Sequence, residues 1–240
     1  MENKKIDLSI IIPCYNEEKN VPLIVDALKN ELKENKNLEL ILVDNGSTDN
    51  TGKKIDICRK KFKNIKKVRV KVNQGYGFGI YSGLKKARGE FLCWTHGDMQ
   101  TNPLDCLRAL EEIKKQKNPE KCFVKGRRIG RTFVEKFFTF GMSVFESLLF
   151  KKILYDINAQ PNLFHKSFLR VAKNPPKDFS FDLYFYVLAA KNNFKIIRFP
   201  VRFEKRKHGK SKWNVNLKER IRFIKRTIDY SFKLKRCIDE

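Results

Sequence analysis

Four polar segments of the sequence carry residue types that bind phosphorylated ligands or metal ions. They are PCYNEE (13–18), DNGSTDNT (44–51), NQGYG (73–77) and HGDMQTNP (96–103), and each follows an apolar run. Taken singly, each is consistent with ordinary turn chemistry, since Asn, Gly, Asp and Pro are common turn formers. Asp98 in the last segment suggests more, because one carboxylate at the end of a buried strand can hold a cation that also binds a substrate phosphate.

The residues between these segments predict the elements that hold them. Strands are expected at 8–12, 38–43, 67–72 and 90–95, where β-branched and apolar residues run together or alternate. Helices are expected at 21–32, from a cap at Ser47 or Thr48 to about Cys58, at 76–87, and from Pro103 onward. This alternation predicts an α/β fold with a mainly parallel sheet. Because ligands bind at the carboxyl ends of such strands, all four polar segments should meet at one edge of the sheet.

The composition is that of a folded soluble protein rather than a disordered chain. The 240 residues are 41% hydrophobic and 33% charged, and the chain is long enough to bury a sizeable core. There is no run of about 18 uncharged apolar residues to predict a transmembrane helix. The apolar run at the N-terminus is too short for a signal peptide. We therefore expect a cytoplasmic protein.

The net charge of the chain is strongly positive. Lys and Arg number 52 against 27 Asp and Glu, which gives +25. Such a balance attracts anions, whether nucleic acid, a membrane surface or phosphorylated substrates. Alternatively, it reflects basic residues on solvated faces. The excess is concentrated at the end of the chain, since residues 201–240 hold fourteen Lys and Arg against five acids.

Several segments, in this order, resemble family 2 glycosyltransferases with the GT-A fold. They are SIIIPCYNEEKNV (9–21), LILVDNGSTDNT (40–51), the stretch from NQGYG to TNP (73–103) and VKGRRIG (124–130). The later FEKRKHGKSK (203–212) resembles the R-x-x-G-x-S-K element of the branch that makes dolichol- or polyprenyl-phosphate sugars. The resemblance covers roughly residues 6–213. It implies a Rossmann-like, mainly parallel sheet flanked by helices, with a GT-A domain at 1–213 and a basic amphipathic helix at 214–240.

The resemblance implies a metal site for Mg²⁺ or Mn²⁺ at the fourth polar segment. Asp98 matches the metal position of the D-x-D motif of the family, and Gln100 matches a residue that can assist it. The first acid of the motif is replaced by His96, which could bind Mn²⁺, contact the donor ribose or sugar, or fill space beside Trp94. The cation would neutralise the diphosphate as it leaves.

The resemblance also implies residues that bind a nucleotide-sugar donor. Tyr15 offers a stacking face and Glu17 an acceptor for ribose hydroxyls, although Tyr15 also suits a structural role. Asn45 replaces the second of two adjacent acids usual in the family, so the choice between a GDP- and a UDP-linked donor stays open. The full implied set is Pro13, Tyr15, Glu17, Val43, Asp44, Asn45, His96, Gly97, Asp98, Arg128, Arg206 and Lys212.

The acceptor region departs from the pattern of the lipid-phosphate branch. DINAQPNLF (156–164) stands where that branch shows a D-x-x-S-G-F-R type stretch. Asp156 agrees with it, but Gln160, Pro161 and Asn162 do not. A phosphate acceptor needs no base, whereas a sugar hydroxyl needs a carboxylate. Asp182 is the candidate base, although it could instead cap a helix with Ser180 or pair with a lysine. The many basic residues and the 203–212 element favour a polyprenyl phosphate.

Two stretches, 131–154 and 216–236, predict amphipathic helices. The first is rich in Phe and the second places apolar residues on one face among many cations. Basic amphipathic helices bind anionic membrane surfaces, but core packing would give the same pattern. Membrane contact would be peripheral, and we expect it at the cytoplasmic face.

The function that these features predict is an inverting, metal-dependent glycosyltransferase that uses a polyprenyl phosphate acceptor. One alternative is transfer to a sugar hydroxyl of a glycan. A second is a non-catalytic transferase, suggested by His96 and Asn45. A third is a nucleic-acid-binding protein, which would leave the four polar segments unexplained and shows no known nucleic-acid motif, so no nucleic-acid partner is expected.

Overall fold

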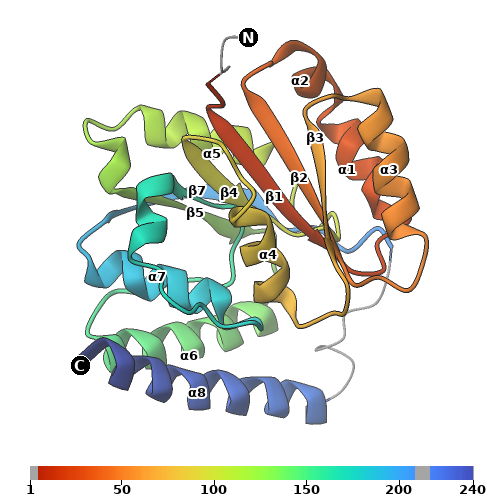
Figure 1. The fold of residues 1–240 in the computed structure, drawn as a ribbon. Coiled ribbons are helices and arrows are strands. Elements are labelled where there is room, and N and C mark those ends of the chain that lie inside the picture. The colour runs from red at the N-terminus through yellow and green to blue at the C-terminus, as the bar shows by residue number, and fades with distance from the viewer. Residues whose placement is uncertain (1–4, 209–216, 240) are drawn as a thin grey trace.

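Seven strands form one sheet in the order β3-β2-β1-β4-β6-β5-β7 (Figure 1). The computed structural model describes residues 5–208 and 217–239. The strands are β1 (Leu8–Cys14), β2 (Leu38–Asn45), β3 (Ile65–Val70), β4 (Phe91–Trp94), β5 (Cys122–Ile129), β6 (Asn162–His165) and β7 (Lys195–Arg202). The pairs β1–β2, β1–β4, β2–β3 and β5–β7 are parallel, while β6 runs antiparallel to both β4 and β5. The prediction of a mainly parallel sheet is therefore confirmed.

Helices cover both faces of this sheet. They are α1 (Asn20–Ala27), α2 (Lys29–Glu34), α3 (Thr51–Lys61), α4 (Tyr76–Leu84), α5 (Asp105–Lys114), α6 (Phe133–Phe150), α7 (Phe181–Lys191) and α8 (Leu217–Asp239), with 3₁₀ turns at Pro119–Lys121 and Lys166–Arg170. Side chains of β1 alternate between two apolar layers. Ile10 and Ile12 lie in the layer with α1, α3 and α5, and Ile11 lies in the layer with α4 and α7.

The helices α6 and α8 lie side by side below α7 (Figure 1). The rings of Phe145 and Phe232 meet edge to face between them. Leu234 of α8 belongs to the apolar layer that contains α4 and α7. Both helices were expected from their apolar spacing. Within the described ranges, neither they nor any other helix has the length and apolar content that crossing a bilayer requires.

Several boundaries differ from the sequence prediction, and three of them have a clear physical reason or consequence. The helix expected at 21–32 is divided at Leu28, and because Leu28 and Leu32 both remain buried, apolar spacing cannot locate the break. The third strand ends at Val70, and Val72 is exposed. The helix after Pro103 begins two residues later, at Asp105. The Asn102 side chain accepts from the backbone N–H of Leu104, and its carbonyl accepts from that of Asp105, so the intervening residues form a turn.

The predicted cap at Ser47 or Thr48 is also wrong. Helix α3 begins at Thr51, and Asn50 occupies its N-cap position. The Ser47 hydroxyl accepts from the backbone N–H of Asn16 (3.2 Å), and the Thr48 backbone N–H donates to the Asn16 side chain (2.9 Å). These two residues therefore join the segments that follow β1 and β2 instead of capping a helix.

Candidate active site

The segments that follow β1 and β2 are tied together at the carboxyl edge of the sheet. Pro13 and Val43 are register partners in the parallel pair. Beyond the strands, the backbone N–H of Glu17 donates to the Thr51 hydroxyl over 2.7 Å. Tyr15 and Glu17 are half-buried on this rim. The structure thus brings together the first two predicted donor-binding segments.

Glu17 occupies an environment that favours its neutral form. Partial burial raises the pKa of Glu17 to about 7. The hydrogen bond from the Asn20 side chain acts to lower this pKa, and the nearby charge of Asp98 acts to raise it. The electrostatic interaction between Glu17 and Asp98 is consistent with their placement at the same edge. A half-buried carboxyl of this kind suits hydrogen bonding to a ribose hydroxyl.

The side chains of Asp44 and Asn45 are buried and form hydrogen bonds with backbone groups of neighbouring segments. Asp44 accepts from the backbone N–H of Ser47 over 3.1 Å. The Asn45 amide donates to the carbonyl of Gly75 over 3.0 Å and so holds the segment that follows β3. Among the described residues, the Asn45 side-chain oxygen has no hydrogen-bond partner.

Asp98 lies just beyond β4 and is buried, with 6% of its surface exposed. The backbone N–H of Gln100 donates to one carboxylate oxygen (3.1 Å), and Arg206 forms an ion pair with the other (2.9 Å). Arg206 also donates to the Gln100 side chain (3.1 Å). A Cβ at Gly97 would stand 2.9 Å from the Pro13 carbonyl, so a glycine here lets the segment after β4 approach β1.

The oxygen ligands at Asp98 fit a metal ion whose remaining ligands come from the substrate. Within the part of the chain that the structure describes, no three His, Cys, Asp or Glu side chains gather as a metal cage. Mg²⁺ and Mn²⁺ sites that act on nucleotides need only one or two carboxylates, because phosphate oxygens and water fill the other positions. Asp98 supplies such a carboxylate, and Gln100 stands beside it. Arg206 is the group that a cation would displace from Asp98.

His96 is half-buried between Asp98 and Tyr76. Its ring centroid is 5.5 Å from that of Tyr76, at an angle of 32°. Burial lowers the pKa of His96, while the charges of Asp98 and Asp182 act to raise it. The net shift keeps the imidazole neutral near pH 7, which is the state needed either for metal binding or for a hydrogen bond to a sugar.

Asp182 lies in the first turn of α7 and is 1% exposed. One of its oxygens accepts from the Trp94 indole (2.9 Å), the Gln160 amide (2.9 Å) and the Asn162 amide (3.2 Å). The alternative of a helix cap shared with Ser180 is not found, since the Ser180 side chain makes no cap hydrogen bond. Gln160 and Asn162, which depart from the pattern of the lipid-phosphate branch, are the residues that hold Asp182.

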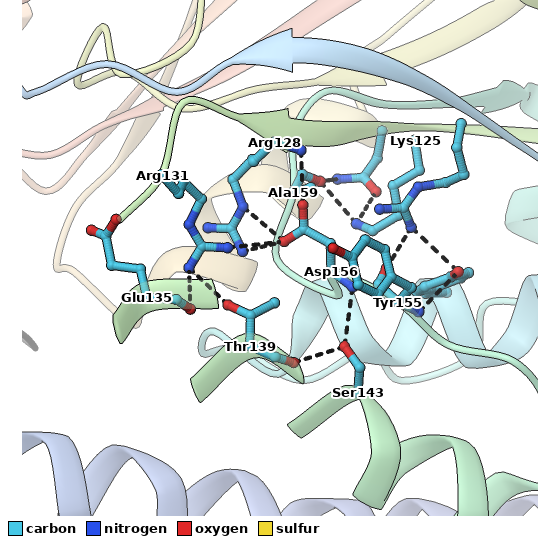
Figure 2. Close-up of polar contacts among 12 residues, drawn as sticks. Lys125, Arg128, Arg131, Glu135, Thr139, Ser143, Tyr155, Asp156 and Ala159 are labelled. Carbon is cyan, nitrogen blue, oxygen red and sulfur yellow. Dashed lines mark hydrogen bonds and ion pairs between the residues drawn. The ribbon is translucent and has the colours of Figure 1, made fainter. Parts of the chain in front are cut away.

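Four basic residues gather near the buried carboxylate of Asp156, and Figure 2 shows three of them, Lys125, Arg128 and Arg131. Arg128 donates to both oxygens of Asp156, from its backbone N–H (2.9 Å) and its Nε (2.8 Å). Arg131 lies 3.5 Å from the same carboxylate and donates to Thr139 of α6 (2.7 Å). Lys125 and Arg198 complete the group as register partners on β5 and β7. We call Lys125, Arg128, Arg131, Arg198 and Asp156 the cationic cluster.

Lys125 is fully buried within the cationic cluster. Its ammonium donates to the Asn162 side chain (2.7 Å) and the Ala159 carbonyl (2.9 Å). Burial lowers the pKa of Lys125 to about 7, although the nearby charge of Asp182 acts to raise it. Because Asn162 also donates to Asp182, one hydrogen-bonded path connects the cationic cluster to Asp182.

The cationic cluster carries more positive charge than the single carboxylate of Asp156 neutralises. Burial acts to raise the pKa of Asp156, but the ion pair with Arg128 holds it below its ordinary value, so the carboxylate is ionised. Burial lowers the pKa of both Arg131 and Arg198. Three buried guanidinium nitrogens have no hydrogen-bond partner among the described residues: Nε of Arg131, and Nε and Nη2 of Arg198. An anion that entered this cluster would balance its excess positive charge.

The sequence analysis missed the roles of Lys125 and Arg198. Each directly follows two apolar residues in the interior of its strand, and a cation at such a position is a signal that buried charge serves a site. Arg127, by contrast, is exposed. Lys212 lies outside the residues that the structure describes.

Comparison with protein families gives a match over most of the chain. The model described as glycosyl transferase family 2 matches residues 9–173. A dolichyl-phosphate beta-glucosyltransferase of Trichomonas vaginalis (ALG5A) is 33% identical over 148 residues, which covers 56% of this chain and 46% of that protein. A dolichyl-phosphate beta-glucosyltransferase of Dictyostelium discoideum is 29% identical over 192 residues, which covers 71% and 58%. The chain thus spans about half the length of the curated relatives it matches.

Solved structures share the fold at low sequence identity. Glucosyl-3-phosphoglycerate synthase from Mycobacterium tuberculosis, in complex with Mn²⁺, UDP and phosphoglyceric acid, aligns with a TM-score of 0.74 at 15% identity, covering 96% of this chain and 78% of that one. A mannosyltransferase from Pyrobaculum calidifontis, in complex with GDP-Man and Mn²⁺, aligns with a TM-score of 0.65 at 18% identity, covering 86% and 59%. These likenesses confirm the predicted GT-A fold.

Proposed function

This chain belongs to glycosyl transferase family 2, and from that membership we propose that it moves a hexose from a nucleoside-diphosphate sugar to a polyprenyl phosphate. The observation that carries the acceptor is the cationic cluster, where three buried guanidinium nitrogens have no partner among the described residues. A phosphate monoester supplies the oxygens and the charge that this cluster lacks. The names of the curated relatives, which are dolichyl-phosphate glucosyltransferases, support the same acceptor class.

The donor would lie at the ends of β1, β2 and β4. Tyr15 and Glu17 would contact the nucleoside, and Asp98 with Gln100 would hold Mg²⁺ or Mn²⁺ at the diphosphate. The cation, when bound, neutralises the charge that develops on the leaving diphosphate. Arg206 would turn from Asp98 to a phosphate oxygen, since its guanidinium is already at this position. The solved neighbours that contain Mn²⁺ with UDP or GDP-Man support this use of the site.

The chemistry at the acceptor would need no general base. A phosphate oxygen is already an anion, so it can attack the anomeric carbon directly while the nucleoside diphosphate leaves from the opposite face with inversion. Asp182 would then position the reacting groups through Gln160 and Asn162. Transfer to a sugar hydroxyl would instead require Asp182 to take a proton, and this carboxylate is buried and already accepts three hydrogen bonds on one oxygen.

The outer layer beside the cationic cluster suits a lipid substrate. Helix α6 exposes a group of large apolar side chains: Phe137, Phe138, Phe140, Val144 and Leu148. The adjacent α8 exposes many cations, among them Lys225, Lys233 and Arg236. Apolar side chains flanked by cations bind anionic membrane surfaces. We infer peripheral contact with the cytoplasmic face of a membrane, from which the acceptor would reach Arg131.

A panel of nucleotide sugars tests the proposal. Purified protein with Mg²⁺ or Mn²⁺ is given UDP- and GDP-linked hexoses together with a polyprenyl phosphate, the matching polyprenol, or an oligosaccharide. We expect glycolipid only from the phosphorylated lipid. Product from the oligosaccharide and none from the lipid phosphate would reject the proposed acceptor, and it would favour the hydroxyl alternative.

A further inference from the structure

Strand β3 ends the sheet on one side and is paired along only one of its two edges. It stands first in the order β3-β2-β1-β4-β6-β5-β7, and within the described ranges no strand pairs with its outer edge. The backbone N–H of Leu40 in β2 donates to the carbonyl of Asn64 over 3.0 Å. Because the backbone groups of a strand point to its two sides in alternation, those of Lys67 and Arg69 face outward. These two residues offer two N–H donors and two carbonyl acceptors at the open edge.

Strand β7, which ends the sheet on the other side, is less suited to pairing. It contains Pro200, which has no backbone N–H. Arg108 of α5 donates to the Pro200 carbonyl over 3.3 Å, so this acceptor is already used. Strand β3 contains no proline. The two ends of the sheet therefore differ, and β3 is the end at which a further strand can be added.

A groove of about 460 Å³ lies against β3. Two of the residues that line it, Ile65 and Val68, are apolar. Ile65 packs in the apolar layer with α3, and Val68 packs against the layer with α4, so the groove lies at the edge of the sheet between these two helices. The other five lining residues are basic: Arg59 of α3, Lys66, Lys67 and Arg69 of β3, and Lys86, which follows α4.

Three of the five basic residues share two acids of the protein. Lys67 forms an ion pair with Asp56 of α3 over 2.6 Å, and Arg59 lies 3.8 Å from the same carboxylate. Lys66 forms an ion pair with Glu39 of β2 over 2.9 Å. The protein itself therefore neutralises only part of the charge that lines the groove.

The remaining two basic residues, Arg69 and Lys86, are exposed. Within the described part of the chain, neither has an acidic partner. The excess of positive charge extends beyond the groove, since residues 53–72 hold ten Lys and Arg against one acid. A ligand for this surface should consequently be acidic.

We propose that the open edge of β3 binds an extended, acidic segment of a partner protein, which adds a strand to the sheet. The backbone of the partner would pair with Lys67 and Arg69, and its acidic side chains would meet the cations of the groove. Alternate residues of an added strand face opposite sides of the sheet. Acidic residues would thus lie near Arg59 and Arg69 on the side of α3, and apolar ones against Val68 on the side of α4. The groove contains no residue assigned to the proposed function, so the inference is independent of it.

The chemistry of this edge disfavours three other occupants. A second copy of this chain carries the same excess of Lys and Arg, so the two edges would repel each other. Phosphate groups of nucleic acid accept hydrogen bonds but donate none, which would leave the outward carbonyls unpaired, and the groove is lined by no aromatic residue of the described chain for base stacking. A membrane that contacts α6 and α8 would lie apart from α3 and β3 (Figure 1).

Binding of designed peptides tests strand addition on the wild-type protein. The probe is a fluorescently labelled peptide of about ten residues that alternates Glu with Val. Its affinity for the full chain is measured by fluorescence anisotropy at about 0.15 M salt, where remote charges are screened. Two further peptides carry backbone N-methyl groups on all Val or on all Glu residues. Only alternate residues of an added strand pair with β3, so we expect one methylated peptide to lose at least about tenfold in affinity and the other to retain it.

Two substitutions of Arg69 separate charge from backbone pairing. Arg69→Gln removes the charge and keeps the N–H, and we expect it to weaken binding of the unmodified peptide about threefold. Arg69→Pro also removes the N–H, which faces away from β2, so pairing within the sheet is retained while affinity falls by at least about tenfold. Arg202→Gln is the control, because it removes an exposed arginine from β7 and should leave the affinity unchanged.

Each other outcome overturns a specific statement. Equal affinities of Arg69→Gln and Arg69→Pro, or equal losses for the two methylated peptides, would reduce the contact to charge and reject strand addition. No binding of the unmodified peptide up to about 1 mM would reject the proposal as a whole. A single-stranded oligonucleotide of equal charge that binds more tightly than the peptide, and loses affinity in Arg69→Pro, would assign the groove to nucleic acid. If Arg69→Pro melts well below the wild type, the methylated peptides decide the question with the wild-type protein.

Discussion

The two halves of the candidate active site balance their charges in different ways. On the donor side, Asp98 and Arg206 neutralise each other, and Gln100 hydrogen-bonds to both. On the acceptor side, Arg128 and Arg131 pair with Asp156 while Lys125 and Arg198 lie nearby, and three guanidinium nitrogens have no partner among the described residues. We propose that an incoming cation takes over the Asp98 carboxylate in the donor half, whereas an anion completes the acceptor half. We therefore expect the donor to bind with a cation that replaces Arg206 at Asp98, and the acceptor to bind as an anion that adds negative charge to the cationic cluster.

Loss of Asp98 should have the largest effect. Asp98→Ala removes the only carboxylate proposed for the cation, so we expect the transfer rate to fall by about a thousandfold or more. Initial rates at saturating Mn²⁺ measure this loss. Gln100→Ala, which leaves the carboxylate in place, should cost far less. A rate above a tenth of wild type in Asp98→Ala would mean that the donor half does not work through this residue.

Loss of the shared carboxylate in the acceptor half should mainly affect stability. Asp156→Asn leaves three half-buried arginines and the buried Lys125 without their shared counter-charge, and we expect a loss of about 3–5 kcal/mol in the free energy of unfolding, measured by urea denaturation. Asp105→Asn is the matched control, because burial raises the pKa of Asp105 and its partner Arg108 is half-exposed. Its loss should be clearly smaller. Equal losses would show that Asp156 balances no unusual charge.

The contact between helices α6 and α8 should make the free energy of unfolding depend on pH. Glu146 of α6 is fully buried, accepts from Ser231 of α8 over 2.6 Å, and burial raises its pKa to about 7. The folded protein therefore favours the protonated form, so the free energy of unfolding should fall as the pH rises from about 4.5 to about 7 and then level off.

Glu146→Gln should abolish that part of the pH dependence. The variant should match the wild type near pH 4 and exceed its free energy of unfolding by about 3 kcal/mol at pH 8. Denaturation curves at several pH values provide the measurement. A variant that is less stable than the wild type at pH 8 would show that the carboxylate is paired when ionised, which contradicts its placement between α6 and α8.

Inorganic phosphate should stabilise the acceptor half by a smaller amount. At a concentration about ten times its dissociation constant, phosphate adds about 1.4 kcal/mol to the free energy of unfolding. We expect a rise in Tm with the wild type and none with Arg198→Gln, at constant ionic strength. Arg127→Gln is the control, since Arg127 is exposed and outside the cationic cluster. Equal rises in all three proteins would place the phosphate elsewhere.

The donor half was largely predictable from the sequence, and the physical reason is the parallel sheet. Segments that follow parallel strands share an edge, so the neighbourhood of Glu17, Asn45 and Asp98 follows from the strand pattern alone. Periodicity could not show that Arg206, more than a hundred residues later, would reach Asp98. That position came from the resemblance of the 203–212 element.

The acceptor half could not be predicted in the same way, because its contacts join residues that no local pattern relates. Lys125 meets Arg198 only through the β5–β7 pairing, and β6 enters the sheet antiparallel between β4 and β5. Gln160 and Asn162 read as departures from a motif, although they are the donors that fix Asp182. Side-chain networks across a sheet depend on register, which the sequence alone does not reveal.

A crystal structure with both substrates bound tests the account most directly. Crystals would contain Mn²⁺, a nucleoside diphosphate and a short-chain polyprenyl phosphate. We predict an anomalous manganese peak in contact with the Asp98 carboxylate, and the lipid phosphate within hydrogen-bond distance of Arg131 and Arg198. Manganese bound away from an Asp98 still paired with Arg206, or a lipid phosphate outside the cationic cluster, would contradict the account.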